Sequence, residues 1–395
     1  MACTPTTILI FLFFSAQSFA SDPTPAFLVA ESLVTEPPVF DLNPTRVKRN
    51  IFDDAKSYAD SLLEEAVSFA TDGVVEFLQD LPTGEAVLEA AGVSDVDGEP
   101  TQALNIPGYG NWSEEDGWRL RLHGNIFKQP DISDERIEDL ANIFLIDTSV
   151  EELPPSEAAQ AINMTRSIFI VQQDEVDVTM EVGTEPLGED QEPGEDSETI
   201  ELPDPTTDQG DFDIFVPISA EGFESGRGEK PPQRINTYVE GSSAGNATAY
   251  LISQEGLTII SDIDDILRIT KIFDPKEGLL NSFARPYRPF LNMPDVYANW
   301  SESMPDLHFH YLTTTPEQVT RNYMEFIYST YPGGSFDTRP LNFSDISATL
   351  SIRKFLLDKV FQTYPQRKFV LVADTTNSDV MVSRDTALPI IKNQT

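Results

Sequence analysis

Two aspartates separated by one residue, Asp262 and Asp264, directly follow an apolar, β-branched run at residues 257–261. Because alternate residues of an extended chain point to the same side, both carboxylates could reach one substrate group. One carboxylate could attack phosphorus and form an acyl phosphate, while its neighbour protonates the leaving alcohol and later activates water. The alternative is that these acids only end a strand and begin a loop, where acidic residues are common.

Two similar runs, residues 307–312 and 368–373, end at Thr313 and Asp374. Strands alternating with helices at these lengths predict a parallel sheet, and in such a sheet ligands bind outside the carboxyl ends of the strands. The sequence therefore predicts that Asp262, Thr313 and Asp374 converge at one edge of a Rossmann-like sheet. Apolar residues at helical spacing lie between the last two runs, over residues 316–329 and 346–363.

Several aspartates that face a phosphate need a cation to screen their like charges, and oxygen ligands favour Mg²⁺. Asp374 and Asp379 could supply further ligands to that ion or orient its waters, beside Asp262 and Asp264. Thr313 could donate a hydrogen bond to a phosphoryl oxygen, and a lysine would neutralise the charge that develops there. These residue types predict Mg²⁺-dependent transfer of a phosphoryl group.

An ordered series of short motifs runs through the last third of the chain. They are Ser261-Asp262-Ile263-Asp264-Asp265 with Ile269-Thr270, then residues 309–316, Tyr331-Pro332-Gly333-Gly334, Arg353-Lys354, and residues 364–374. In these motifs residues 255–382 resemble the catalytic domain of the fungal actin-patch-associated, Mg²⁺-dependent phosphatidate phosphatases, a branch of the haloacid-dehalogenase superfamily. Residues 110–127 faintly resemble the N-terminal β-domain of that family.

The resemblance implies a haloacid-dehalogenase-like fold and hydrolysis of a phosphate monoester, with phosphatidate to diacylglycerol as the favoured reaction. It also implies Mg²⁺ as the cofactor and an aspartyl-phosphate intermediate. The implied roles are Asp262 as nucleophile, Asp264 as general acid/base, Thr313 as the phosphate contact, Lys354 as the charge-stabilising lysine, and Asp374 and Asp379 as metal-site acids beside Asp262 and Asp264.

Several positions depart from the family pattern, among them residues 314–317, where Thr-Thr-Pro-Glu replaces the usual Gly-Ser-Pro-Trp. Ala373 stands where the family has glycine, Thr375-Thr376 replaces Ser-Gly, and Ile266 occupies a position that is usually Thr or Val. The complete series of ionisable residues favours an active enzyme. The alternative is a catalytically weakened secreted relative that binds a phospholipid or a partner protein.

The overall charge limits the partners. The 395 residues include 26 Lys+Arg and 66 Asp+Glu, a formal net charge of -40. This balance excludes nucleic acid and disfavours a bare anionic membrane, because phosphate contacts need clustered cations. A metal ion and a local basic rim still allow an anionic substrate and transient membrane contact. Lys276, Arg285 and Arg288 could form that rim, or they could pair with surface acids.

The N-terminal residues predict secretion. An apolar run at residues 8–14 precedes Ser18-Phe19-Ala20, so residues 1–20 are typical of a cleaved signal peptide, the alternative being an uncleaved anchor or a buried strand. The basic pair Lys48-Arg49 would end a pro-segment, residues 21–49, or is an ordinary exposed pair. N-glycans are predicted at six sequons, at Asn111, Asn163, Asn246, Asn299, Asn342 and Asn393.

The remaining pattern divides the mature chain into a helical segment (residues 50–92), a β-sandwich-like all-β module (110–252) and the phosphatidate phosphatase-like domain (253–395). Residues 174–213 hold 16 acids and no Lys or Arg, which predicts a mobile acidic loop at 184–209. A Ca²⁺ site is the alternative, although no EF-hand spacing is present. His308 and His310 are predicted to be structural core residues rather than metal ligands.

Overall fold

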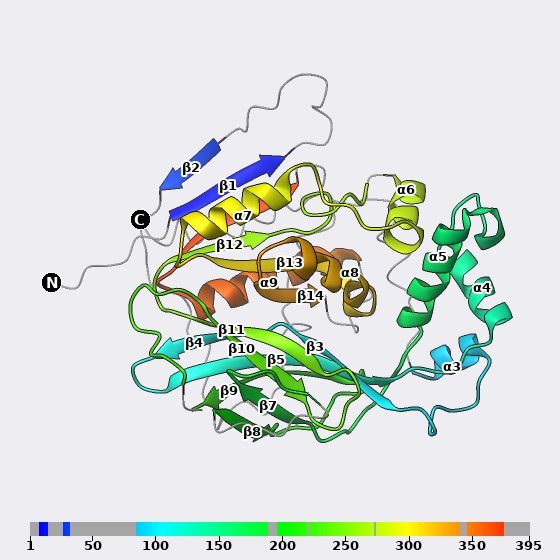
Figure 1. Ribbon diagram of the computed structural model, residues 1–395, viewed down its shortest axis with the longest axis horizontal. Helices are drawn as coiled ribbons and strands as arrows, with labels where there is room; N and C mark the ends of the chain where they lie inside the picture. The colour runs from blue at the N-terminus through cyan, green and yellow to red at the C-terminus, as the bar shows by residue number, and fades with distance from the viewer. Residues whose placement is uncertain are drawn as a thin grey trace.

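The computed structural model describes residues 8–14, 27–31, 84–188, 196–219, 222–271, 274–339 and 346–374 (Figure 1). These residues form two sheets, one parallel over most of its width and one largely antiparallel. Most of the predicted helical segment 50–92 lies outside the described residues, which begin within it at residue 84. Its described part contains helix α3 (Glu85–Ala91).

The C-terminal sheet confirms the predicted parallel arrangement. Its strand order is β14-β13-β12-β15-β1-β2. From β14 to β1 every neighbouring pair is parallel, and only β2 runs antiparallel to β1. The strands are β1 (Ile8–Phe14), β2 (Phe27–Glu31), β12 (Leu257–Ser261), β13 (His308–Pro316), β14 (Ser335–Arg339) and β15 (Lys368–Asp374).

Helices cover both faces of this sheet, which explains why its strands are almost continuously apolar. Ile260 and Leu371 pack with Leu357 of α9 in one core. Ile259 packs with Tyr323 of α8 in another core, to which α7 also contributes. The helices are α6 (Pro275–Leu279), η2 (Leu280–Ala284), α7 (Met293–Ser303), α8 (Glu317–Thr330) and α9 (Ile346–Thr363), so both helices expected from spacing are present.

Strand β1 is the apolar run that the sequence predicts to be the core of a signal peptide. Its backbone pairs in parallel with β15, from Leu9 opposite Phe369 to Phe14 opposite Asp374. A strand in this segment is one of the alternatives to a signal peptide that the sequence leaves open. The pairing does not test cleavage, so secretion stays a prediction.

The other sheet has nine strands, which confirms the predicted β-rich module. Its order is β3-β5-β4-β11-β10-β7-β8, and β6 and β9 also pair with β5, so the strands form one hydrogen-bonded sheet rather than two separate ones. The strands are β3 (Thr101–Ile106), β4 (Tyr109–Ser113), β5 (Gly117–Lys128), β6 (Val171–Gln172), β7 (Thr179–Gly183), β8 (Ser197–Glu201), β9 (Asp211–Ile218), β10 (Gln233–Val239) and β11 (Asn246–Ile252).

Part of the predicted acidic loop 184–209 is a strand instead. Strand β8 pairs antiparallel with β7, from Ser197 opposite Gly183 to Glu201 opposite Thr179. The reason is local alternation, since Ile200 packs against the apolar core of the module while Thr199 and Glu201 on either side of it are exposed. Residues 189–195 lie outside the described residues.

A helical layer sits beside the two sheets, at the right of Figure 1. Ser133 begins α4 as expected for a cap, because its Oγ accepts the Arg136 backbone N–H at 3.4 Å. This layer consists of α4 (Asp134–Asn142), η1 (Val150–Glu152) and α5 (Pro155–Ile168). Within the described part of the chain, none of the helices combines the length and the apolar character that a bilayer crossing requires.

A buried network of charges joins the two sheets. Arg121 of β5 contacts Asp213 of β9 at 2.7 Å and Asp337 of β14 at 2.5 Å. Lys359 of α9 contacts Asp213 at 3.0 Å, so two cations face two anions. Burial raises the pKa of both carboxyl groups, but Arg121 and Lys359 together with a nearby histidine outweigh it and hold each pKa below its usual value. The network ties the parallel sheet to the β-rich module.

Candidate functional site

The strand register brings the predicted residues to one edge of the parallel sheet. Ser261 of β12 lies opposite Tyr311 of β13 and Val372 of β15. Asp262 follows this row by one residue, and Thr313 and Asp374 follow it by two. Neighbouring strands are about 5 Å apart, so all three backbones lie within reach of one small group. The predicted convergence at the carboxyl edge is present.

Asp262 is held in place by backbone contacts. Its N–H donates to the Val372 carbonyl oxygen at 2.9 Å, and its Oδ1 accepts the Ile263 N–H at 2.8 Å. The residue is only 4% exposed. Its carboxylate is thus oriented before any substrate arrives, which suits a nucleophile that must approach phosphorus along one line.

Asp264 lies within a cluster of hydrogen-bond donors. Its Oδ1 accepts Arg268 Nε at 2.9 Å and Thr270 Oγ1 at 2.7 Å, while Thr315 Oγ1 donates to Oδ2 at 3.3 Å. Burial by itself would lower the pKa of Arg268, but the adjacent Asp264 carboxylate raises it, so the guanidinium stays charged. Since Oδ1 is occupied, Oδ2 is the oxygen of Asp264 that can exchange a proton with a substrate.

Arg268 is itself tightly held. It is 2% exposed, and its guanidinium lies over the rings of Tyr323 at 4.5 Å and Tyr287 at 5.2 Å. Its Nη2 also donates to Ser282 Oγ at 3.3 Å. Sequence reasoning missed this residue, because an arginine four residues after an aspartate is a common pattern with no chemical signature of its own.

Thr313 is a buried acceptor with a proton left to give. Its Oγ1 accepts the Thr315 backbone N–H at 3.1 Å and the Tyr323 hydroxyl at 3.3 Å. Burial raises the pKa of Tyr323, and the nearby Asp264 charge raises it further, so the phenol stays a donor. Because Oγ1 is the acceptor in both contacts, neither uses the Thr313 hydroxyl proton, and the contact of this hydroxyl with a phosphoryl oxygen stays a prediction.

The structure places the cation of Arg353 beside Asp262. Arg353 Nη1 lies 3.5 Å from Asp262 Oδ1, and the arginine is 4% exposed. Lys354, one residue later on α9, points its Nζ toward Asp358 at 3.4 Å. Successive helix residues differ by about 100°, so the two side chains leave α9 in different directions. Lys354 stays a prediction as the charge-stabilising residue, with Arg353 as the better placed cation.

The predicted metal site is only partly described. Asp374 ends β15 beside β12, but its side chain and all of Asp379 lie outside the described residues. Among the described side chains, no three His, Cys, Asp or Glu residues group closely enough to hold a metal ion. Asp262 and Asp264 contribute buried carboxylate oxygens, which is the donor chemistry that Mg²⁺ prefers. The described part of the site therefore fits Mg²⁺ without completing its ligands.

The two histidines of β13 have structural partners. His308 Nε2 lies 2.9 Å from Ser335 Oγ, and His310 Nε2 lies 3.0 Å from Asp337 Oδ2. Both partners belong to β14, so the histidines tie these strands together below the site. Burial lowers the pKa of His308 well below its usual value, which keeps the ring neutral.

The expected basic rim is divided between paired and exposed cations. Arg285 is paired, since its Nη1 lies 2.9 Å from Glu277 Oε2 and its Nε 3.9 Å from Glu157 Oε2. The exposed Arg288 extends from the loop between η2 and α7. Both alternatives raised by the sequence therefore occur, since Arg285 pairs with acids and Arg288 is an exposed cation.

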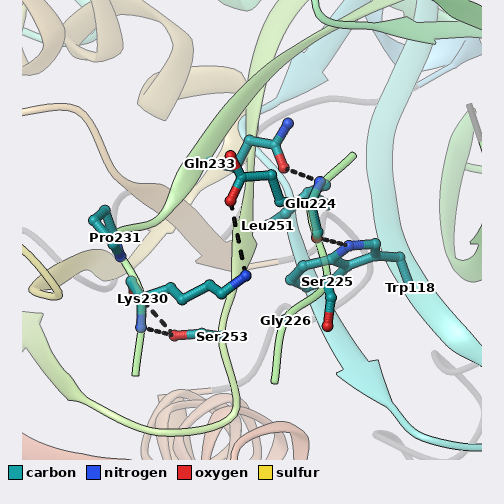
Figure 2. A pocket seen from close by; sticks show the side chains of 9 residues that line it. All are labelled: Trp118, Glu224, Ser225, Gly226, Lys230, Pro231, Gln233, Leu251 and Ser253. Atoms are coloured by element: carbon teal, nitrogen blue, oxygen red, sulfur yellow. Dashed lines mark hydrogen bonds and ion pairs between the residues drawn. The ribbon is translucent and has the colours of Figure 1, made fainter. Parts of the chain in front are cut away.

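A small pocket in the β-rich module lies apart from this edge. Figure 2 shows Trp118, Glu224 and Lys230 around it, with Trp118 Nε1 donating to the Glu224 carbonyl oxygen at 2.7 Å. Lys230 Nζ lies 3.8 Å from Glu224 Oε2. The pocket has a volume of about 20 Å³, which suits one water molecule and is too small for a phosphate ester.

Comparison with known proteins points to the part of the chain that contains the candidate site. Residues 257–388 match the family model described as "Phosphatidate phosphatase APP1, catalytic domain". The chain is also 25% identical over 171 residues to "Phosphatidate phosphatase APP1" of Saccharomyces cerevisiae. That alignment spans 40% of this chain and 29% of the yeast protein, so the two share one region rather than their whole length.

The matched region contains the edge described above. Within it lie Asp262, Asp264, Thr313, Arg353 and Asp374, while the β-rich module precedes the family match. The resemblance seen in the sequence motifs is thus confirmed over this region. Residues 257–388 are therefore similar to the catalytic domain of the phosphatidate phosphatase APP1.

Proposed function

We propose that this chain is a Mg²⁺-dependent phosphatase that hydrolyses a phosphate monoester, with phosphatidate as its favoured substrate and diacylglycerol as product. The observation that supports this most is the strand register, which gathers Asp262, Thr313 and Asp374 at one edge of a sheet that matches the APP1 catalytic domain. The haloacid-dehalogenase-like fold belongs to the same proposal.

In the proposed reaction, an Asp262 carboxylate oxygen attacks phosphorus and the bond to the lipid oxygen breaks. Asp264 gives its proton to the leaving alcohol through Oδ2, and an aspartyl phosphate remains on Asp262. Asp264 then takes a proton from water, which attacks phosphorus and frees both phosphate and the Asp262 carboxylate. Thr313 donates a hydrogen bond to a phosphoryl oxygen, and Arg353 or Lys354 balances the negative charge on that oxygen.

Mg²⁺ would be held by Asp262 and Asp264, with Asp374 and Asp379 as the further acids. Bound there, the ion would neutralise charge on the phosphoryl oxygens. Secretion, a cleaved signal peptide at residues 1–20 and N-glycans belong to the proposal too, and they rest on the sequence pattern alone.

The test is phosphate release by the purified full-length chain. Phosphatidate in mixed micelles and a soluble aryl phosphate would be compared, each with Mg²⁺ and with a chelator. The proposal expects Mg²⁺-dependent release from phosphatidate that exceeds release from the soluble ester, with diacylglycerol formed in equal amount. Equal, metal-independent release from both would favour the alternative of a weakened, lipid-binding relative.

A further inference from the structure

The loop between η2 and α7 exposes an apolar side chain in a strained backbone conformation. Leu291 is 59% exposed, the highest value among the large apolar side chains that the structure describes as exposed. Its φ of 48° is left-handed, which costs a bulky L-residue about 1–2 kcal/mol. Strain of this kind gathers at functional sites and is retained where the surroundings enforce it.

The surroundings of Leu291 hold its backbone in this left-handed conformation. Pro286 and Pro289 restrict the backbone of this loop. Two hydrogen bonds also tie the loop to the segment that follows Asp262 and Asp264. The Ile269 N–H donates to the Arg288 carbonyl oxygen at 3.0 Å, and the Phe290 N–H donates to the Leu267 carbonyl oxygen at 3.0 Å. The exposed leucine is therefore presented by a fixed loop.

The loop lies beside the candidate site. Asp264 forms a β-bridge with Arg268, and Arg268 forms another with Pro289. Two bridge spacings place the Pro289 backbone about 10 Å from that of Asp264. The tip at Leu291 thus projects close to the edge where a substrate phosphate must enter.

Charge near the tip suits an anionic surface. Arg288 is exposed, and none of the hydrogen bonds or ion pairs described for this chain engages its guanidinium, whereas Arg285 is paired with Glu277. Asp295 is the exposed acid nearest in sequence. Salt screens the more distant acids, because the Debye length at physiological ionic strength is about 8 Å.

We propose that residues 286–291 dock this chain on an anionic phospholipid bilayer, with Leu291 entering the interface and Arg288 meeting lipid phosphate. The proposal rests on the proposed function, since it explains how a bilayer lipid reaches Asp262 and Asp264. An apolar side chain beside a cation is the composition of interfacial anchors.

Vesicle co-sedimentation tests the docking. Phosphatidylcholine vesicles with and without phosphatidate would be mixed with the full chain, with Leu291→Asn and with Arg288→Gln. Asparagine tolerates a left-handed φ, so Leu291→Asn should keep its melting temperature. Binding to the phosphatidate vesicles should weaken about tenfold for Leu291→Asn, as expected for loss of one buried leucine, and severalfold for Arg288→Gln.

Ile143→Asn is the matched control, because Ile143 is 54% exposed on another element, at the end of α4. It should bind as the wild type does. Equal binding by Leu291→Asn and wild type, equal loss in Ile143→Asn, or no vesicle binding at all would overturn the proposal. So would a Leu291-dependent dimer with unchanged vesicle binding, which would make a second copy the occupant.

Hydrolysis of the soluble aryl phosphate separates this proposal from the catalytic one. Leu291-dependent vesicle binding without any hydrolysis would overturn the phosphatase proposal alone. Hydrolysis together with Leu291-independent binding would overturn the docking proposal alone.

Discussion

Arg268 and Asp264 form a buried ion pair at the candidate site, with Arg268 Nε 2.9 Å and Nη2 2.8 Å from the same carboxylate oxygen. This ion pair uses Oδ1 of Asp264, so Oδ2 of Asp264 faces Thr315 and the expected position of the substrate. An acid that must work from one oxygen is thereby oriented by a residue outside the predicted catalytic series.

Replacing Arg268 by methionine should destabilise the fold by about 3–5 kcal/mol, because it leaves the Asp264 carboxylate buried without its partner. Urea denaturation of the wild type and the variant measures this. Arg288→Met, at an exposed position, serves as the control and should change the free energy of unfolding by less than about 1 kcal/mol. A loss for Arg268→Met no larger than the control's would contradict the role of the pair.

The two neighbouring cations of α9 should differ in their effect on catalysis. Arg353→Ala should lower kcat about 100-fold or more, since it removes the cation 3.5 Å from Asp262. Lys354→Ala should have a much smaller effect, because Lys354 faces Asp358. Steady-state kinetics on the soluble aryl phosphate compares them, and a larger effect for Lys354→Ala would restore the lysine to the role first predicted.

The charge network between the sheets should be worth more than an exposed ion pair. Arg121→Met leaves Asp213 and Asp337 buried near one remaining cation, so a loss of about 3–5 kcal/mol is expected. Arg227→Met, which breaks an exposed pair with Glu114, should cost less than about 1 kcal/mol. Similar losses in denaturant titrations would show that the network does not fix the two sheets together.

A buried pair of acids should make stability depend on pH. Asp211 of β9 and Glu317 of α8 are both buried and lie close enough for each to influence the pKa of the other. Burial raises the pKa of Asp211 to about 7 and also raises that of Glu317. Nearby, burial lowers the pKa of His123 to about 3 and that of Arg321 to about 10.

The sign follows from these shifts. A carboxyl whose pKa is raised by folding stabilises the fold at low pH and loses that contribution as pH rises, here from about pH 4 through pH 7 and above. Buried neutral His123 acts oppositely between about pH 3 and 6.5, so it offsets part of the loss from the acid pair in that range and no longer does so above it. The free energy of unfolding should fall by a few kcal/mol from pH 6 to pH 9.

Glu317→Gln should flatten that alkaline decline, because an amide needs no proton to donate to Asp211. Glu325→Gln, at an exposed position of the same helix, is the control and should keep the wild-type slope. Denaturant titrations across this pH range measure both variants. An unchanged slope in Glu317→Gln would show that the two acids do not influence each other's pKa.

The sequence predicts this fold best where hydrophobic pattern and chain order are both strong. The runs that become β12, β13 and β15 are apolar and end in polar residues, so a parallel sheet with a site at its edge follows from elementary rules. The strand within the acidic stretch was missed, because the single apolar residue Ile200 between Thr199 and Glu201 is a weaker signal than the acidic composition around it.

The site could be predicted as residue types but not as contacts. Asp262, Asp264 and Thr313 stand at strand ends, which sequence can indicate. The choice between Arg353 and Lys354 depends on the rotation of α9 about its axis, and the contact of Arg268 with Asp264 depends on the tight turn after β12, where Asp265 has a φ of 56°. Neither quantity is fixed by local sequence.

Rapid-quench trapping of a phosphorylated Asp262 tests the central claim most directly. Labelled phosphatidate, Mg²⁺ and the full chain would be mixed and acid-quenched, and the labelled peptide identified by mass spectrometry. A transient phosphoryl group on the peptide that contains Asp262, absent from Asp262→Asn, is the predicted result. Phosphate release without any labelled protein, or equal labelling and release in Asp262→Asn, would contradict it.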